Sequence, residues 1–134
     1  MNKMLIVTNN NKVYEKHKEN RDVLFLEKAT HLEVLEKTRD LVHKGVRLLS
    51  HPIAGSLKPN QTPYRSILLE KPAHYGDSEN QMIPILDIES LRLIENSIEL
   101  TKRILAVKSI PQWPSKIEED FKTVDLSIID NAIN

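Results

Sequence analysis

The chain of 134 residues contains no cysteine. This absence excludes disulfides, thiolate metal ligands, a nucleophilic cysteine and redox chemistry carried by sulfur. Aromatic residues are also scarce: one tryptophan, three tyrosines and two phenylalanines are too few for the stacking platforms that bind single-stranded nucleic acid. We therefore expect neither a sulfur-based redox enzyme nor a nucleic-acid-binding protein.

Long apolar runs and an excess of charge of one sign are missing as well. No window approaches the about 18 uninterrupted apolar residues of a membrane span, and the run near the N-terminus is too short for a signal-peptide core. Lys and Arg together number 19, as do Asp and Glu, so the formal net charge is zero and no basic nucleic-acid-binding face is indicated. We expect a cytoplasmic protein that does not bind a membrane.

The apolar pattern of the first half predicts alternating strands and helices. A continuous apolar run at 4–7 predicts a strand that is buried on both faces, and short apolar runs at 23–26 and 46–49, the latter with Arg47 within it, predict two further strands. Helices are expected between them, and Thr30 with Glu33 forms a capping box at the start of the second helix. This alternation predicts a parallel sheet with right-handed crossovers.

The second half continues with a fourth strand at 66–69 and a long helix at 88–107. Asp87 is the expected N-cap of that helix. Two apolar stripes along the helix predict that it is covered on more than one side.

The C-terminal segment is ambiguous between helix and strand. Residues 115–118 repeat the capping-box pattern, whereas alternating apolar residues at 124–128 favour a strand. We expect a small three-layer α/β sandwich, with a mostly parallel sheet of about four strands and helices on both faces. Residues 1–110 would form this α/β domain, and 111–134 a helical C-terminal extension, packed on the domain or flexibly attached. In the helical interpretation, one face carries Ile117, Phe121, Val124 and Ile128.

A proline-rich loop, residues 50–66, joins the third and fourth strands. Loops of this length are uncommon in compact domains and are usually functional or disordered. The prolines restrict the backbone and therefore favour an ordered loop. We interpret it as an interaction loop whose candidate contact residues are Pro52, Gly55, Pro59, Pro63 and Tyr64.

Two groups of polar residues follow predicted strands and would meet at the carboxyl edge of the sheet. The first group leaves the first strand, where backbone N–H groups offer an anion site, and the second lies in the proline loop. Two cations in the loop suit a carboxylate or phosphate group. The alternative is structural, with a polar turn that caps a helix and a histidine bonded within its own loop. The candidate ligand-binding residues are Thr8, Asn9, Asn10, His51, Lys58, Asn60, Thr62 and Arg65.

No catalytic set follows from the residues. Ser50 or Ser56 with His51 and Asp87 supplies the residue types of a hydrolytic triad, but no nucleophile elbow surrounds either serine. The histidines show no metal-binding pair, and no carboxylate triad accompanies them. We predict no metal and no cofactor, and the catalytic residues, if any, stay unknown.

Several short motifs together form a recognisable pattern. They are LIVTNN at 5–10, HP at 51–52 with Gly55 and KPN at 58–60, TPY at 62–64 with Ser66, and Asp87 with ESL at 89–91 and IE at 94–95. The pattern resembles the GrdX family, small proteins whose genes accompany the glycine, sarcosine and betaine reductase systems of anaerobic, amino-acid-fermenting bacteria. The resemblance covers roughly residues 4–107, and the proline-rich loop carries most of it.

The resemblance implies a cytoplasmic accessory of a reductase complex that turns glycine into acetyl phosphate and ammonia. It supplies no catalytic residue or cofactor, and the missing cysteine excludes the redox-active component itself. We therefore expect a non-catalytic accessory protein that binds reductase components. The alternative is a protein or enzyme that binds a small anionic metabolite at the carboxyl edge of the sheet. A third interpretation is a homo-oligomer that uses the proline loop as its interface.

Overall fold

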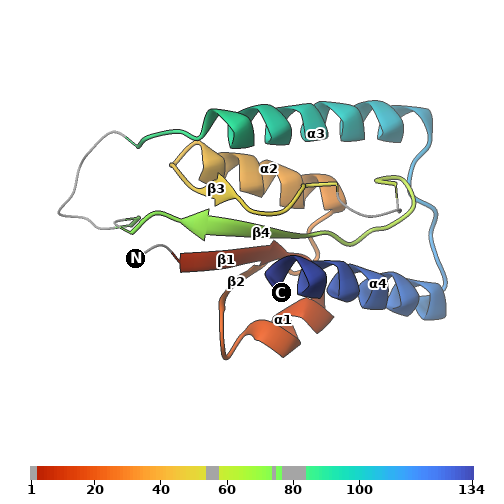
Figure 1. Ribbon diagram of the computed structural model, residues 1–134. Helices are drawn as coiled ribbons and strands as arrows, with labels where there is room; N and C mark the ends of the chain where they lie inside the picture. The colour runs from red at the N-terminus through yellow and green to blue at the C-terminus, as the bar shows by residue number, and fades with distance from the viewer. Residues whose placement is uncertain (1–2, 54–57, 74, 77–83) are drawn as a thin grey trace.

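The computed structural model describes residues 3–53, 58–73, 75–76 and 84–134. Gly55 and Ser56, which the sequence singled out, lie outside the described residues. Strands and helices alternate in the first half, and two long helices end the chain (Figure 1). The elements are β1 (Lys3–Thr8), α1 (Asn11–His17), β2 (Asp22–Phe25), α2 (His31–Val42), β3 (Arg47–Leu48), β4 (Ser66–Lys71), α3 (Ile88–Val107) and α4 (Ser115–Ile133).

Side-chain caps set the start of three helices. Asn10 caps α1, and Asp87 caps α3 as predicted. The predicted capping box of Thr30 and Glu33 begins α2, with both reciprocal hydrogen bonds present. The second predicted capping box is wrong, because α4 starts after Pro114 without a side-chain cap.

The strands form a mixed sheet in the order β2-β1-β4-β3. β1 and β2 are parallel, whereas β4 runs antiparallel to both of its neighbours, β1 and β3. The α/β class and the four strands are confirmed. The prediction of a mostly parallel sheet is wrong, because only the β1–β2 pair is parallel.

The error lies in the direction of β4. β1, β2 and β3 do run in one direction, because β1 pairs in parallel with β2 and both β1 and β3 are antiparallel to β4. After the proline loop the chain turns back, and β4 lies between β1 and β3. Its first four residues are buried, as a central strand covered on both faces requires. A continuous apolar run therefore reports burial on both faces, and it does not report strand direction.

Alternate residues of the central strands supply two separate apolar cores. Leu5 and Val7 of β1 pack with α2 and α3, whereas Ile6 packs with Val13 of α1 and Ile129 of α4. Figure 1 shows the resulting layers, with α2 and α3 above the sheet and α1 and α4 below it. The two faces are thus separated by the period-two alternation of side chains along a strand.

The C-terminal segment is helical, which excludes the competing strand at 124–128. Its buried residues are Asp125 and Ile129. The predicted apolar face is covered only in part, since Val124 is 40 % exposed whereas Ile117, Phe121 and Ile128 are half-buried. That prediction counted apolar side chains only, and it could not place a carboxylate on the buried face.

The long helix α3 is covered on one side only by the described residues. Ile94, Ile98 and Thr101 are buried, and α2 is the helix packed against this side. The second apolar stripe is not covered as predicted, because Leu100 is 45 % and Val107 is 89 % exposed. No described helix is long and apolar enough to cross a membrane.

Candidate functional site

A cluster of buried polar side chains lies where β1 ends and β4 begins. Thr8 and Ser66 are paired in the sheet there, and their hydroxyl oxygens are 2.6 Å apart. The other members come from the turn after β1, from α2, from the proline loop and from α4, and every member is at most 8 % exposed. This set is termed the buried polar cluster and consists of Thr8, Asn9, Asn10, His31, Thr62, Arg65, Ser66 and Asp125.

Asp125 joins α4 to the sheet. Its Oδ1 accepts a hydrogen bond from the Ser66 N–H at 3.1 Å. Its Oδ2 accepts from the Ser66 hydroxyl at 2.7 Å and from Asn10 Nδ2 at 3.0 Å. Burial raises the pKa of Asp125, although these hydrogen bonds and the charge of Arg65 favour the ionised form. The carboxylate is therefore buried together with the donors that a buried charge requires.

On the side of α2, His31 is held between Arg65 and the proline loop. Arg65 Nε donates to His31 Nε2 at 3.3 Å, and His31 Nδ1 lies 3.3 Å from the carbonyl oxygen of Thr62. A guanidinium only donates and a carbonyl only accepts, so the imidazole is neutral and carries its proton on Nδ1. Burial and the neighbouring Arg65 charge lower the pKa of His31 to about 3.

The asparagines after β1 bind other parts of the chain. Asn9 Nδ2 donates to the Pro63 carbonyl, and Asn9 Oδ1 accepts from the Arg65 N–H, both at 2.9 Å. Asn10 Oδ1 caps α1, and its Nδ2 donates to the Lys122 carbonyl at 2.9 Å. These bonds tie the end of β1 to the proline loop and to α4.

The buried polar cluster has the geometry of a structural network. Both ring nitrogens of His31 and both carboxylate oxygens of Asp125 have partners within the chain. A general base must instead reach a proton of the substrate. Ser66 contacts a carboxylate rather than an imidazole, so no hydrolytic triad forms around it. Among the described residues, no group of three His, Asp or Glu side chains could hold a metal ion.

The proline loop is anchored at both ends of its described part. Pro52 and Pro59 are buried. Tyr64 donates its hydroxyl hydrogen to Glu118 at 3.4 Å, and the Lys122 ammonium lies 5.4 Å from the centre of its ring. Burial and the neighbouring Glu118 raise the pKa of Tyr64 to about 12. The loop is thereby attached to α4 next to the buried polar cluster.

A cleft of about 710 Å³ lies at the carboxyl edge of the parallel pair β1–β2. Tyr14 and Phe25 line it as a stacked pair, with ring centres 4.8 Å apart. Tyr64 and Lys122 also line it, and Lys28 adds an exposed cation on a left-handed backbone at φ 66°. This hollow, termed the edge cleft, occupies the position at which open α/β sheets bind ligands.

Three residues of the predicted ligand set lie on another surface. His51, Lys58 and Asn60 line a groove of about 700 Å³ beside the C-terminal half of α3, and none of them lines the edge cleft. His51 Nδ1 accepts from the Ile53 N–H at 3.0 Å, within its own loop. The structure thus brings five members of the set together in the buried polar cluster, namely Thr8, Asn9, Asn10, Thr62 and Arg65.

The predicted ligand-binding set did not include three members of the buried polar cluster: His31, Ser66 and Asp125. Asp125 had a weak signal, because it lies four residues before Ile129 and so shares a helical face with an apolar position. His31 had none, since the first residue of a capped helix is usually exposed. Ser66 was selected only through the family resemblance, and its contact with a distant carboxylate is not visible in a strand pattern.

The fold and the buried polar cluster together define a small α/β protein with a mixed four-stranded sheet and a self-contained polar core at one sheet edge. Searches of curated proteins and of solved structures returned no match. The GrdX-like protein family matches residues 5–134. The chain therefore belongs to the GrdX-like family, and the match extends through α4, beyond the residues that carried the resemblance.

Proposed function

We propose that the protein is a non-catalytic accessory protein that binds a component of a glycine-reductase-type amino-acid fermentation system. Family membership supplies the metabolic context. The observation that supports the non-catalytic part is the closed buried polar cluster. Burial lowers the pKa of His31 and raises that of Asp125, and both side chains make their hydrogen bonds within the chain.

Shifted pKa values often mark catalytic groups, but they also occur at buried structural residues. The exposure of the two side chains to solvent distinguishes a catalytic from a structural role. His31 is 1 % and Asp125 is 4 % exposed. Their partners lie on three segments, the turn after β1, the proline loop and the start of β4, while His31 itself lies on α2 and Asp125 on α4. These hydrogen bonds hold the segments in place relative to one another. A partner would therefore bind to the exposed surface of these segments and not to the buried polar cluster.

The test is capture of the partner followed by reconstitution. The tagged full chain is crosslinked under anaerobic conditions in native cells grown on glycine, and the captured proteins are identified by mass spectrometry. The identified component is then purified and mixed with the chain, and the complex is measured by light scattering. A reductase component that is captured and forms a complex of defined mass supports the proposal.

Two results contradict the accessory function. The first is failure of every reductase component to bind the folded, abundant protein. The second is turnover of acetyl phosphate or of an amino acid by the purified chain that is lost in His51→Ala.

A second candidate function is binding of a small anionic metabolite, and the edge cleft favours it. The cleft lies at the carboxyl end of the parallel strands, and Lys28 and Lys122 would meet a phosphate or carboxylate there. Glu15 and Glu27 also line the cleft, so the anion would have to lie on the lysine side.

Thermal unfolding with phosphates, nucleotides and amino acids tests this candidate. A ligand at about 100 times its dissociation constant adds about 2.7 kcal/mol of stability, which shifts the melting temperature by several degrees. The shift should fall in Lys28→Ala and persist in Lys44→Ala, an exposed lysine beyond the end of α2. A flat response to all three compound classes rejects the candidate.

A further inference from the structure

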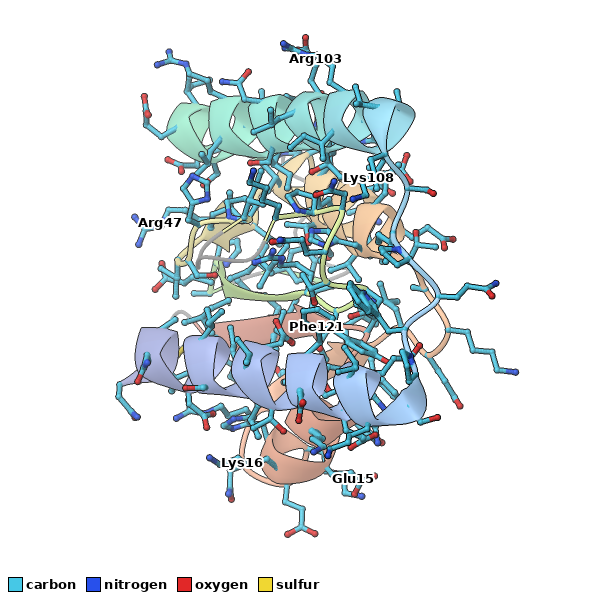
Figure 2. All side chains as sticks on the ribbon, turned by 90° about the vertical axis from the view of Figure 1, so that its right-hand side faces the viewer. Glu15, Lys16, Arg47, Arg103, Lys108 and Phe121 are labelled. Carbon is cyan, nitrogen blue, oxygen red and sulfur yellow. The ribbon has the colours of Figure 1, made fainter. Side chains whose placement is uncertain are left out.

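The surface beside the C-terminal half of α3 carries a groove made of two adjoining hollows. The first, of about 700 Å³, lies between the proline loop and α3, and the second, of about 360 Å³, continues to Trp113 and Phe121. Both are lined by Lys58, Asn60 and Lys108, which makes them one continuous feature. Figure 2 looks onto this end of the molecule, with Lys108 near the end of α3 and Phe121 on α4. The feature is termed the basic groove.

The floor of the basic groove is apolar and exposed. Leu100 and Val107, at 45 % and 89 % exposed, lie seven positions apart on α3 and therefore share one helical face with Ile104 between them. Single exposed apolar residues are ordinary, whereas a contiguous apolar patch with a polar rim marks an interaction surface. These residues belong to the second apolar stripe of α3. The sequence predicts that other segments cover this stripe, whereas the described residues leave Leu100 and Val107 exposed.

An ordered aromatic pair closes the far end of the basic groove. Trp113 Nε1 donates to the Gln61 carbonyl at 2.8 Å, and its ring centre lies 5.5 Å from that of Phe121. The indole is thus fixed before any partner arrives, which lowers the conformational entropy lost on binding. Tryptophan is also among the residues that contribute most to protein interfaces.

The rim of the basic groove carries charge of one sign. Its titratable residues are His51, Lys58, Arg103 and Lys108, and no acidic residue is among the described residues that line it. Arg103 pairs with Glu99 at 2.8 Å on an exposed part of α3. Neither Lys58 nor Lys108 has an ion-pair partner among the residues that the structure describes. The chain as a whole is neutral, so this is a local asymmetry that a partner with carboxylates would complement.

A side-chain amide at the centre of the basic groove has no internal partner. Asn60 lines both hollows, and its Oδ1 is enclosed without a hydrogen bond among the described residues. A half-turn of the amide would present this acceptor to the groove and would break no hydrogen bond that the described residues make. After that half-turn Nδ2 takes the enclosed position, and Oδ1 can accept a hydrogen bond from a backbone N–H of a bound segment.

From these observations, and resting on the accessory function above, we propose that the basic groove is the docking site for an acidic segment of a partner protein. The segment places aliphatic or aromatic side chains on Leu100, Ile104 and Val107. Its carboxylates face Lys58 and Lys108, and a backbone N–H reaches Asn60. The chemistry is that of an amphipathic helix or extended segment in a groove, with charges that select the acidic partner.

Fluorescence polarisation with the purified full chain tests the groove without the native partner. The probe is a labelled amphipathic peptide of about 15 residues, built from Glu, Leu and Ala with leucines at helical spacing. One comparison peptide has Lys in place of Glu, and another has Ser in place of Leu. The acidic apolar peptide should bind, and both comparison peptides should bind at least about tenfold more weakly.

Charge-reversal variants locate the binding. Lys58→Glu/Lys108→Glu should weaken the acidic peptide at least about tenfold, whereas Lys44→Glu/Lys102→Glu makes the same change in net charge at exposed lysines outside the groove and should not. Val107→Ser should weaken binding several-fold, and Ile88→Ser, at the other end of α3 and 60 % exposed, should not. Both apolar substitutions are at exposed positions, so folding is retained.

Three peptide results overturn the docking site: no binding of the acidic peptide, equal binding of the lysine peptide, or unchanged binding in Lys58→Glu/Lys108→Glu. A fourth is a dimer of the wild-type chain that dissociates in this variant, because the groove would then bind a second copy of the chain. Repeating the capture experiment with Lys58→Glu/Lys108→Glu distinguishes failure of this proposal from failure of the accessory function. Capture that persists rejects the groove and leaves the accessory function in place. Failure of the wild-type chain to capture any component rejects the accessory function, while the peptide experiment still decides the groove.

Discussion

The buried histidine of α2 should make the protein less stable in mild acid. His31 is neutral in the fold, with a pKa of about 3, because it is buried and faces the Arg65 guanidinium. In the unfolded chain its pKa returns to the ordinary value of about 6.5. The folded value is the lower one, so the stabilisation is fully present above the unfolded pKa. It is lost as the pH falls from there toward the folded pKa.

The size of the effect follows from proton linkage. Between about pH 7.5 and about pH 5.5 the unfolded chain gains most of one proton at His31, and the folded protein gains almost none. The free energy of unfolding should therefore fall by about 1.4 kcal/mol over this interval because of His31 alone. Most carboxylates stay ionised in this range, so their titration contributes little to the pH dependence of the free energy of unfolding.

Urea denaturation of wild type and His31→Gln at several pH values measures this contribution. Glutamine keeps a donor for the Thr62 carbonyl and an acceptor for Arg65 but does not titrate. Between the same pH limits, the free energy of unfolding of His31→Gln should fall by about 1.4 kcal/mol less than that of wild type. Equal m-values would show that both proteins expose the same amount of surface on unfolding. Parallel curves for the two proteins would refute the argument, because they would mean that His31 gains its proton equally in both states.

The remaining predictions concern the two ends of the sheet. Asp125→Ala should lower the free energy of unfolding by about 3–5 kcal/mol, since it leaves buried donors and the Arg65 charge without their carboxylate. Asp120→Ala, at an exposed position of the same helix, should change it by less than about 0.5 kcal/mol, and urea denaturation that gives equal losses would contradict the role of Asp125. Gly45→Ala should cost about 1–3 kcal/mol in thermal unfolding, because its φ is +96° and the added Cβ would lie 3.3 Å from Pro84 Cβ. Gly76→Ala, at φ +79° with no atom within 4 Å of the new Cβ, should cost less, and a loss equal to that of Gly45→Ala would rule out the contact.

Local sequence signals predicted the helices of this protein well. Capping residues and apolar periodicity act over a few neighbouring positions, so Thr30 with Glu33 and Asp87 could be recognised without knowledge of the rest of the chain. The same local logic failed at Ser115, where the capping-box pattern is present but Glu118 instead accepts a hydrogen bond from Tyr64 in the proline loop. A distant partner thus replaced the local one.

The candidate site depended on contacts that no local pattern contains. The sequence selected Asn9 and Arg65 as polar residues near a sheet edge, but their contact with each other joins positions 56 residues apart. His51 and Lys58 also carry suitable chemistry, yet they line a different surface. Residue type indicated which groups could bind a ligand, and it could not indicate which of them the fold uses internally.

The sequence by itself determined the α/β class, the burial of the central strands, the starts of α2 and α3 and the family, because these depend on composition, short periodicities and short motifs. Only the tertiary structure decided that β4 inserts antiparallel between β1 and β3, and that Asp125 lies on the buried face of α4. It also decided that the second stripe of α3 stays open. The reason is physical: apolar pattern reports how much of a segment is buried, whereas strand direction, polar pairing and open surfaces depend on which distant segments meet.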